Sequence, residues 1–152
     1  MPILPIKHSV QEIEAGCLAA CSQMVLQSLN IEKSQKQLNR LFQTTSFGVP
    51  FSRIMRLEQF GVTVSINTFG DEATLTQMID QSIAPIVFLR TLPLPYWQAD
   101  TQHAVVVIGY DDAHFLVNDP AFDQAPQSVT VEAILLAWDG MDYAFTTIRP
   151  KG

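Results

Sequence analysis

A polar turn separates two apolar runs in the stretch His103-Ala-Val-Val-Val-Ile-Gly-Tyr-Asp-Asp-Ala-His-Phe-Leu-Val-Asn-Asp-Pro120. The runs at residues 103–110 and 115–118 are rich in β-branched and aromatic residues, which favour strands. The acidic pair Asp111-Asp112 between them is typical of a turn, because Asp side chains hydrogen-bond to their own backbone there. The stretch therefore predicts an antiparallel β-hairpin.

The spacing of His103 and Asp119 brings these two residues together if the hairpin loop has an odd number of residues. They are separated by an even number of positions, so a hairpin centred on Asp111 places them opposite one another on one face of the sheet. Directly paired residues have Cβ atoms roughly 4.5–5.5 Å apart, which suits a hydrogen bond between imidazole and carboxylate. A two-residue loop would instead put them on opposite faces.

The first sixty residues are predicted to be mostly helical. Apolar residues at the 3.6-residue period indicate a helix over 15–29 that begins near Gly16 or Cys17. Ser34 and Pro50 suit the starts of two more helices, and Gly61 suits a helix end. The further elements expected are helices over 35–42, 50–60, 72–82 and 130–138 and strands over 62–67, 86–90 and 143–148. Helices followed by an antiparallel sheet predict an α+β fold.

The composition fits a single domain spanning residues 1–152. Its length and 47% hydrophobic content suffice for one shared core. A net charge of -6 and a pI near 4.8 exclude the electrostatic footprint of a protein that binds nucleic acid or an anionic membrane. Neither a secretion signal nor a membrane span is expected from the pattern of apolar residues. With only two cysteines and no disulfide framework, we expect a reducing, cytoplasmic location.

Cys17 is the candidate nucleophile, because it stands where the first helix begins. Unpaired N–H groups and the helix dipole stabilise a thiolate at that position. His103 would take the thiol proton, and Asp119 would orient the imidazole. Taken singly, His103 suits a strand edge and Asp119 a turn ahead of Pro120. Their combination with a thiol favours a cysteine hydrolase.

Other roles for the two cysteines are disfavoured. Cys21, one turn further on among apolar neighbours, is interpreted as a small buried hydrophobe. A zinc site would need ligands gathered from scattered positions, since the chain has neither a CxxC pair nor closely spaced histidines. The sequence predicts neither a metal nor another cofactor.

Three further residues complete the candidate site. Gln11, on the segment that leads into the first helix, is predicted to donate its amide to a developing oxyanion together with the Cys17 backbone N–H. Tyr96 and Trp97 follow two prolines just before His103, and we expect them to line or cover the substrate cleft. Packing on the core is the alternative for both aromatic residues.

The chain resembles the papain-like cysteine peptidases of family C39, and within them the group that stands alone as a single domain. The matching pieces are Gln11 with Gly16-Cys-Leu-Ala-Ala-Cys21, Leu92-Pro-Leu-Pro-Tyr-Trp97, His103-Ala-Val-Val-Val-Ile-Gly-Tyr110 and Val117-Asn-Asp-Pro120. The resemblance implies N-terminal helices packed on a C-terminal antiparallel sheet. It also implies Cys17 as nucleophile, His103 as general base and acid, Asp119 as orienting residue and Gln11 as oxyanion donor.

The resemblance also suggests a substrate class. Family members fused to ABC transporters remove leader peptides after a double glycine, so a peptide or protein substrate is expected, with an export or processing partner acting in trans. Leu18 stands where a glycine is common, which bears on the shape of the cleft. Two alternatives stay open: a papain-like acyltransferase or amidase acting on a non-peptide substrate, and a catalytically silent module that binds a peptide without cutting it.

Overall fold

A single antiparallel sheet organises the structure. The computed structural model describes residues 2–151, and its six strands follow the order β1-β6-β2-β3-β4-β5. All neighbouring strands run antiparallel. The elements are, in chain order, α1 (Cys17–Ser28), α2 (Gln35–Phe42), the 3-10 helix η1 (Phe51–Phe60), β1 (Val62–Asn67), α3 (Glu72–Asp80), β2 (Ile86–Arg90), β3 (Gln102–Tyr110), β4 (His114–Asn118), β5 (Gln127–Thr130), α4 (Val131–Asp139) and β6 (Phe145–Pro150). The predicted α+β fold is confirmed.

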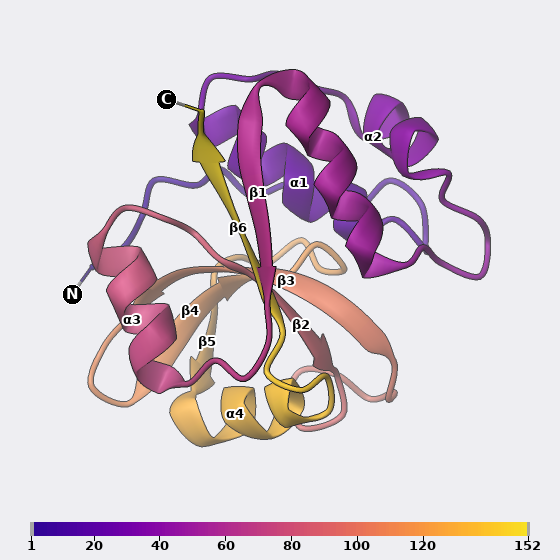
Figure 1. Cartoon of the computed structure of the whole chain (residues 1–152). Coiled ribbons are helices and arrows are strands. Elements are labelled where there is room, and N and C mark those ends of the chain that lie inside the picture. Colours follow the sequence, from indigo (N-terminus) through magenta and orange to yellow (C-terminus); the bar gives the residue numbers. More distant parts are fainter. Residues whose placement is uncertain (1, 152) are drawn as a thin grey trace.

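Helices cover both faces of this sheet. Figure 1 shows α1, α2 and η1 grouped on one side of the sheet and α4 on the other. The central strand β3 is buried on both faces, so its side chains alternate between two apolar clusters. Ala104, Val106 and Ile108 join the cluster with α1, whereas Val105 and Val107 join the cluster with α3 and α4. The expectation of one shared core is wrong in this respect, because the sheet separates two.

The predicted helix starts and ends correspond to the local hydrogen bonds. Ser34 accepts from the backbone N–H of Gln37 while the Gln37 side chain accepts from the Ser34 N–H, a capping box. Gly61 ends η1 in the left-handed region at φ 83°, where glycine carries no steric cost. The helix before it is a 3-10 helix: its two buried residues, Ile54 and Leu57, are three apart and share one face at three residues per turn.

The hairpin of β3 and β4 differs from the predicted register. Tyr110 pairs with Phe115, so the loop is even-numbered, and a bulge between Val107 and Gly109 then shifts the pairing by one residue. Further along, Val106 pairs with Asn118. With the even-numbered loop alone, His103 and Asp119 would lie on opposite faces of the sheet. The bulge shifts the register by one residue and returns them to the same face. His103 and Asp119 therefore share a face but are not directly opposite.

Two strand predictions need correction. β5 was not expected, because only one residue of this strand, Val129, is both apolar and fully buried. The last strand begins at Phe145 and not at Tyr143. Asp142 and Tyr143 both have positive φ values near 55°, which no strand accommodates. None of the helices within residues 2–151 is long and apolar enough to cross a membrane.

Candidate active site

Cys17 is the first residue of α1, as predicted. The first hydrogen bond of the helix runs from the Ala20 N–H to the Gly16 carbonyl at 3.1 Å. The N–H groups of Cys17 and the two residues after it therefore fall outside the helical ladder. The preceding Gly16 leaves room for the approaching segment, since a Cβ there would lie 2.9 Å from Cγ1 of Ile13. The thiol thus sits at the positive end of a helix, beside free backbone donors.

His103 and Asp119 form a short, buried hydrogen bond. The Nε2 of His103 donates to Oδ1 of Asp119 at 2.7 Å, and both side chains are at most 5% exposed. Burial alone lowers the pKa of His103, but the hydrogen bond to Asp119 and the adjacent Cys17 outweigh it and raise that pKa to about 9. Burial raises the pKa of Asp119, yet the bond from His103 leaves that pKa below its ordinary value.

The thiol and the imidazole meet at the end of the sheet. Cys17 belongs to the layer of α1, whereas His103 near the start of β3 lies on the face of Val105 and Val107. Cys17 is near enough to the imidazole to raise its pKa, and both residues line one groove. Because Nε2 is committed to Asp119, Nδ1 is the nitrogen left for the thiol.

Tyr96 and Trp97 meet Asp119 from the loop between β2 and β3. The Tyr96 hydroxyl and the Trp97 indole N–H each donate to Oδ2 of Asp119 at 2.9 Å. The backbone N–H of Ala121 adds a bond to Oδ1 at 3.0 Å. Trp97 also lines the groove, while the Tyr96 hydroxyl is directed at the carboxylate. Both side chains are partly buried against the cluster with α3 and α4.

Gln11 reaches the same groove, but its amide hydrogens are engaged. Its Nε2 donates to the carbonyl oxygens of Ile13 at 3.1 Å and Glu14 at 2.6 Å. Its backbone N–H donates to the Pro120 carbonyl at 2.7 Å, which ties the segment before α1 to the residue after Asp119. Within residues 2–151, the buried Oε1 of Gln11 has no hydrogen-bond partner.

Cys21 lies beneath the site and not in it. Its side chain is fully buried, and its thiol donates to the carbonyl of Ala104, the residue after His103, at 3.3 Å. Burial first, and then the charges of Cys17 and Asp119, raise the pKa of the Cys21 thiol. A buried thiol of this kind packs and is not reactive. The described residues hold no group of three or more metal-ligating side chains.

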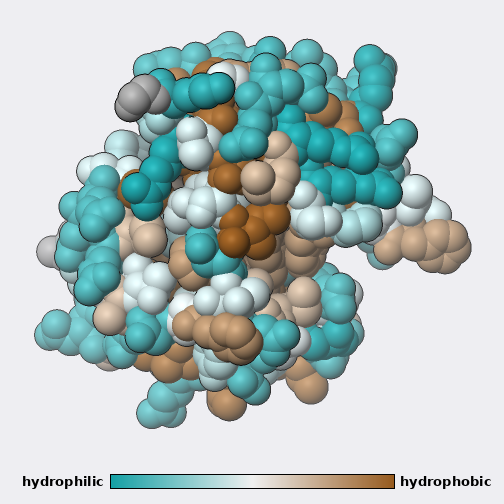
Figure 2. Space-filling model, viewed as in Figure 1, coloured by the Kyte–Doolittle hydropathy of each residue, from teal (hydrophilic) through white to brown (hydrophobic). Residues whose placement is uncertain are grey.

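The groove around Cys17 has a volume of about 780 Å³. The segment 47–51, which leads into η1, lines it with three apolar side chains, Phe47, Val49 and Phe51, and we call these residues the apolar wall. Phe47 stands fully in solvent at the tip of the turn 45–48. Figure 2 shows an apolar projection at the right, where Figure 1 places the loop between α2 and η1. Sequence patterns do not predict this wall, although the aromatic residue of the Ser46-Phe47-Gly48 turn is a signal for an exposed apolar contact.

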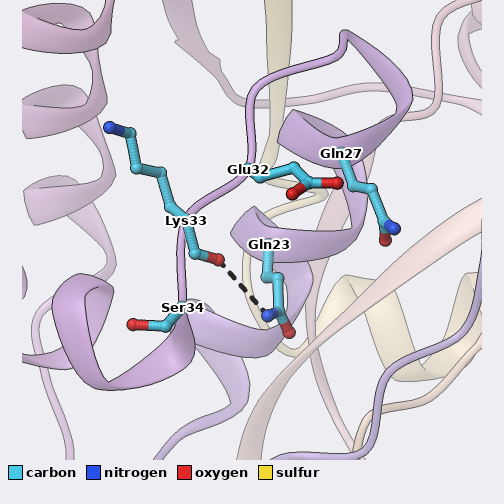
Figure 3. Close-up of a pocket in the computed structure, with 5 residues that line it drawn as sticks. All are labelled: Gln23, Gln27, Glu32, Lys33 and Ser34. Carbon is cyan, nitrogen blue, oxygen red and sulfur yellow. Dashed lines mark hydrogen bonds between the residues drawn. The ribbon is translucent and has the colours of Figure 1, made fainter.

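A second, smaller hollow lies between α1 and the segment that leads into α2. It measures about 330 Å³ and is lined by Gln23, Gln27, Glu32, Lys33 and Ser34. Figure 3 shows the Gln23 amide bonded to the Lys33 carbonyl, with the Lys33 side chain turned away. The Lys33 ammonium packs over the Phe60 ring instead, at 4.5 Å from its centroid. The Ser34 hydroxyl caps α2 by accepting from the Gln37 N–H, and the hollow contains neither a cysteine nor a histidine, so it is not the candidate active site.

Comparison with known proteins identifies the family of the chain. The model of the Peptidase C39 family matches residues 5–147, so the chain belongs to the Peptidase C39 family. No curated protein sequence matches the chain.

Three solved structures share the fold. The peptidase domain of Streptococcus ComA, a bi-functional ABC transporter involved in quorum sensing, has a TM-score of 0.78 at 18% identity, covering 96% of this chain and 99% of that one. A putative C39-like peptidase from Bacillus anthracis has a TM-score of 0.78 at 16% identity, covering 100% of both chains. A double glycine motif protease from an AMS/PCAT transporter, in complex with its leader peptide, has a TM-score of 0.77 at 15% identity, covering 98% of this chain and 94% of that one.

Proposed function

We propose that the chain is a cysteine peptidase that cleaves an amide bond of a peptide through Cys17, His103 and Asp119. The observation that carries the proposal is the buried 2.7 Å hydrogen bond from His103 to Asp119, next to a thiol at a helix N-terminus. In this arrangement the thiol is the nucleophile, the imidazole next to it is the base, and the carboxylate behind the imidazole orients it, as acyl transfer requires.

The proposed reaction has two steps. The Cys17 thiolate attacks the peptide carbonyl carbon, and the electron pair of the C=O bond moves to the oxygen as the C–S bond forms. The imidazolium of His103 then gives its proton to the leaving amine as the C–N bond breaks, which leaves a thioester. Water, deprotonated by His103, hydrolyses the thioester and restores the thiol.

The oxyanion would be held by two N–H donors. The Cys17 backbone N–H lies outside the helical ladder and needs no rearrangement to donate. The Gln11 amide would have to turn from the carbonyls of Ile13 and Glu14, which it contacts in this structure. The unpartnered Oε1 within the described chain lowers the cost of that rotation, since no bond to it is lost.

We propose a leader segment as the substrate, because one of the similar structures is a protease in complex with a leader peptide. The open groove and its apolar wall at Phe47, Val49 and Phe51 suit an extended chain that carries apolar side chains. Trp97, on the side of His103, would contact the same chain. An export or processing partner in trans and a cytoplasmic location stay predictions.

One observation favours a second candidate function. With its amide engaged by Ile13 and Glu14, Gln11 leaves the oxyanion site incomplete, as expected of a module that binds a peptide without cutting it. An acyltransferase or amidase would use the same residues and differ only in the acceptor or the substrate.

A library of peptides derived from cellular protein separates these functions. The library is incubated with the wild type, with Cys17→Ala and with Cys21→Ala, and new N-termini are identified by mass spectrometry. A peptidase gives new termini with the wild type and Cys21→Ala but none with Cys17→Ala. Peptide retention by all three proteins without new termini would support the silent module. Products extended by an added amine would indicate acyl transfer.

A further inference from the structure

Asp119 accepts more hydrogen bonds than an orienting carboxylate needs for the imidazole alone. Its Oδ1 accepts from His103 Nε2 at 2.7 Å and from the Ala121 N–H at 3.0 Å. Its Oδ2 accepts from the Tyr96 hydroxyl and the Trp97 indole N–H, both at 2.9 Å. The side chain is fully buried, so each of these four bonds replaces water that cannot reach it.

We propose that Tyr96 and Trp97 are positioning residues that fix the Asp119 carboxylate, and that they act on the thiol only through Asp119 and His103. This inference rests on the proposed function, in which Asp119 orients the catalytic imidazole. It assigns the two aromatic residues a place behind the imidazole in addition to any contact that Trp97 makes with substrate.

The donors suit a carboxylate in particular. An indole N–H can only donate, and burial together with the charge of Asp119 raises the pKa of Tyr96, so its hydroxyl keeps its proton. His103 and the Ala121 N–H also donate, which surrounds Asp119 with donors on both oxygens. A carboxylate accepts all of them, whereas an Asn would turn its NH₂ group toward one of the two donor pairs. Neither aromatic donor carries charge, so the negative charge of Asp119 remains available to the imidazolium.

Hydrogen bonds join the two ends of the loop that carries both donors. Thr91 N–H donates to the Thr101 carbonyl at 3.0 Å, and the Thr91 hydroxyl donates to the Ala99 carbonyl at 2.6 Å. Within the loop, the backbone N–H of Trp97 donates to the Leu94 carbonyl at 3.1 Å, and the Leu94 side chain is buried. The loop therefore presents Tyr96 and Trp97 from a fixed frame, as a positioning role requires.

Aromatic rings enclose the carboxylate. Phe122 meets the Tyr96 ring at 5.1 Å and the Trp97 ring at 5.2 Å, in both cases edge to face. The Trp97 ring in turn lies 5.0 Å from the His103 ring. These contacts exclude water from the bond between His103 and Asp119, which strengthens it electrostatically. The titratable groups that act on His103 are Asp119 and Cys17. Tyr96 and Cys21 lie near Asp119, whose charge raises the pKa of both.

A small neutral thiol reagent tests the proposal without any substrate. The rate of Cys17 alkylation by iodoacetamide is followed by intact mass and peptide mapping from pH 5 to 10 in the wild type, Tyr96→Phe, Trp97→Phe and Asp119→Ala. We expect Tyr96→Phe and Trp97→Phe each to slow alkylation at pH 7 on the order of tenfold, the scale of one hydrogen bond to a charged group. The basic limb of the profile should move to lower pH, because a less firmly held Asp119 supports the imidazolium less.

A double-mutant cycle shows through which residue the donors act. In the Asp119→Ala background, Tyr96→Phe should have no further effect on the rate, and a remaining effect of Trp97→Phe would report the contact of its ring with His103. Tyr110→Phe is the matched control: it removes a hydroxyl that donates to another aspartate, Asp80, at 2.6 Å, and it should leave the rate unchanged. Tyr96→Phe removes only one oxygen atom. If Trp97→Phe does not fold, Tyr96→Phe alone shows whether the donors act through Asp119.

Three results would overturn the proposal, and they differ in meaning. If Asp119→Ala slows alkylation but Tyr96→Phe and Trp97→Phe do not, Asp119 needs no positioning by these residues and the proposed function stands. If Asp119→Ala itself leaves the rate and its pH profile unchanged, the three residues do not form a working set, and the proposed function fails as well. A rise in KM with unchanged alkylation would assign Tyr96 and Trp97 to the substrate alone and would also overturn the inference.

Discussion

His103 and Asp119 are offset by two residues across the strand pair and are still joined by a 2.7 Å hydrogen bond. In the register of Val106 with Asn118, the residue opposite Asp119 is Val105. Asp119 therefore reaches back along the strand toward the start of β3, where His103 lies at the end of the sheet. This offset brings the imidazole to the edge at which α1 presents Cys17, so the strand end and the helix start meet at one groove.

The raised pKa of His103 makes the stability of the fold depend on pH. Its unfolded pKa is near 6.5 and its folded pKa about 9, so its contribution is fully present below pH 6.5 and is lost as the pH rises through 9. The shift corresponds to at most about 3 kcal/mol in the free energy of unfolding. Urea unfolding at pH 6 and pH 10 should show a larger loss for the wild type than for His103→Gln. An equal loss in both proteins would contradict the assigned pKa.

Asp119→Asn tests the demand for acceptors on both oxygens. The variant keeps the shape of the side chain but turns two N–H donors toward groups that also donate. We expect kcat to fall about 10²–10⁴-fold, the range that proton transfer by a positioned base supplies. Thermal unfolding should also occur at a lower temperature, because buried donors lose their partner. An Asn variant with wild-type turnover would show that the carboxylate is dispensable.

Local sequence patterns predict much of the fold. The capping box at Ser34 and the left-handed Gly61 depend on their own neighbours, so sequence rules predict them. The bulge near Ile108 cannot be predicted in this way, because it depends on the N-terminal segment. There the Leu4 N–H donates to the Ile108 carbonyl, and Ile3 forms a β-bridge to Gly109. A partner about a hundred residues away cannot be recognised from alternation within a strand.

The candidate site likewise combines features that local sequence patterns predict with contacts that they do not. Cys17 at a helix start follows from periodicity, and the pairing of His103 with Asp119 follows from hairpin parity once the bulge is included. The bonds of Tyr96 and Trp97 to Asp119 join residues more than twenty positions apart through a loop of irregular backbone. Loop conformation depends on tertiary packing, so the sequence placed these aromatic residues near the site without showing which atom they bind.

Cys17→Ala and Cys21→Ala should separate reactivity from packing. Cys17 is half-buried at the groove, so Cys17→Ala should abolish rapid labelling with little change in the free energy of unfolding. Cys21 is fully buried, and Cys21→Ala should keep the labelling but lower that free energy by about 1 kcal/mol through lost packing and the lost bond to Ala104. Intact mass and urea unfolding of both variants measure the two effects. Rapid labelling that persists in Cys17→Ala would exclude Cys17 as the activated thiol.

Gln11→Ala tests whether the amide takes part in the reaction despite its contacts with Ile13 and Glu14. If it turns to the oxyanion, its removal should lower kcat about 10²–10³-fold with a small change in KM, because the bond forms only in the transition state. Alkylation of Cys17 by iodoacetamide should stay near the wild-type rate, since that reaction forms no oxyanion. A kcat unchanged by Gln11→Ala would leave the Cys17 backbone N–H as the donor and Gln11 as a structural residue.

Phe47→Ala tests the apolar wall of the groove. Phe47 is fully exposed at the tip of a turn that the backbones of Thr45 and Gly48 close with two hydrogen bonds, so its removal should change the free energy of unfolding by less than about 0.5 kcal/mol. If the wall binds an apolar side chain of the peptide, KM should rise roughly tenfold, the scale of one buried aromatic contact, while kcat and alkylation stay unchanged. Phe69→Ala is the control, because Phe69 is 79% exposed and lies outside the groove. Equal effects of both variants on KM would show that the wall is not part of the substrate site.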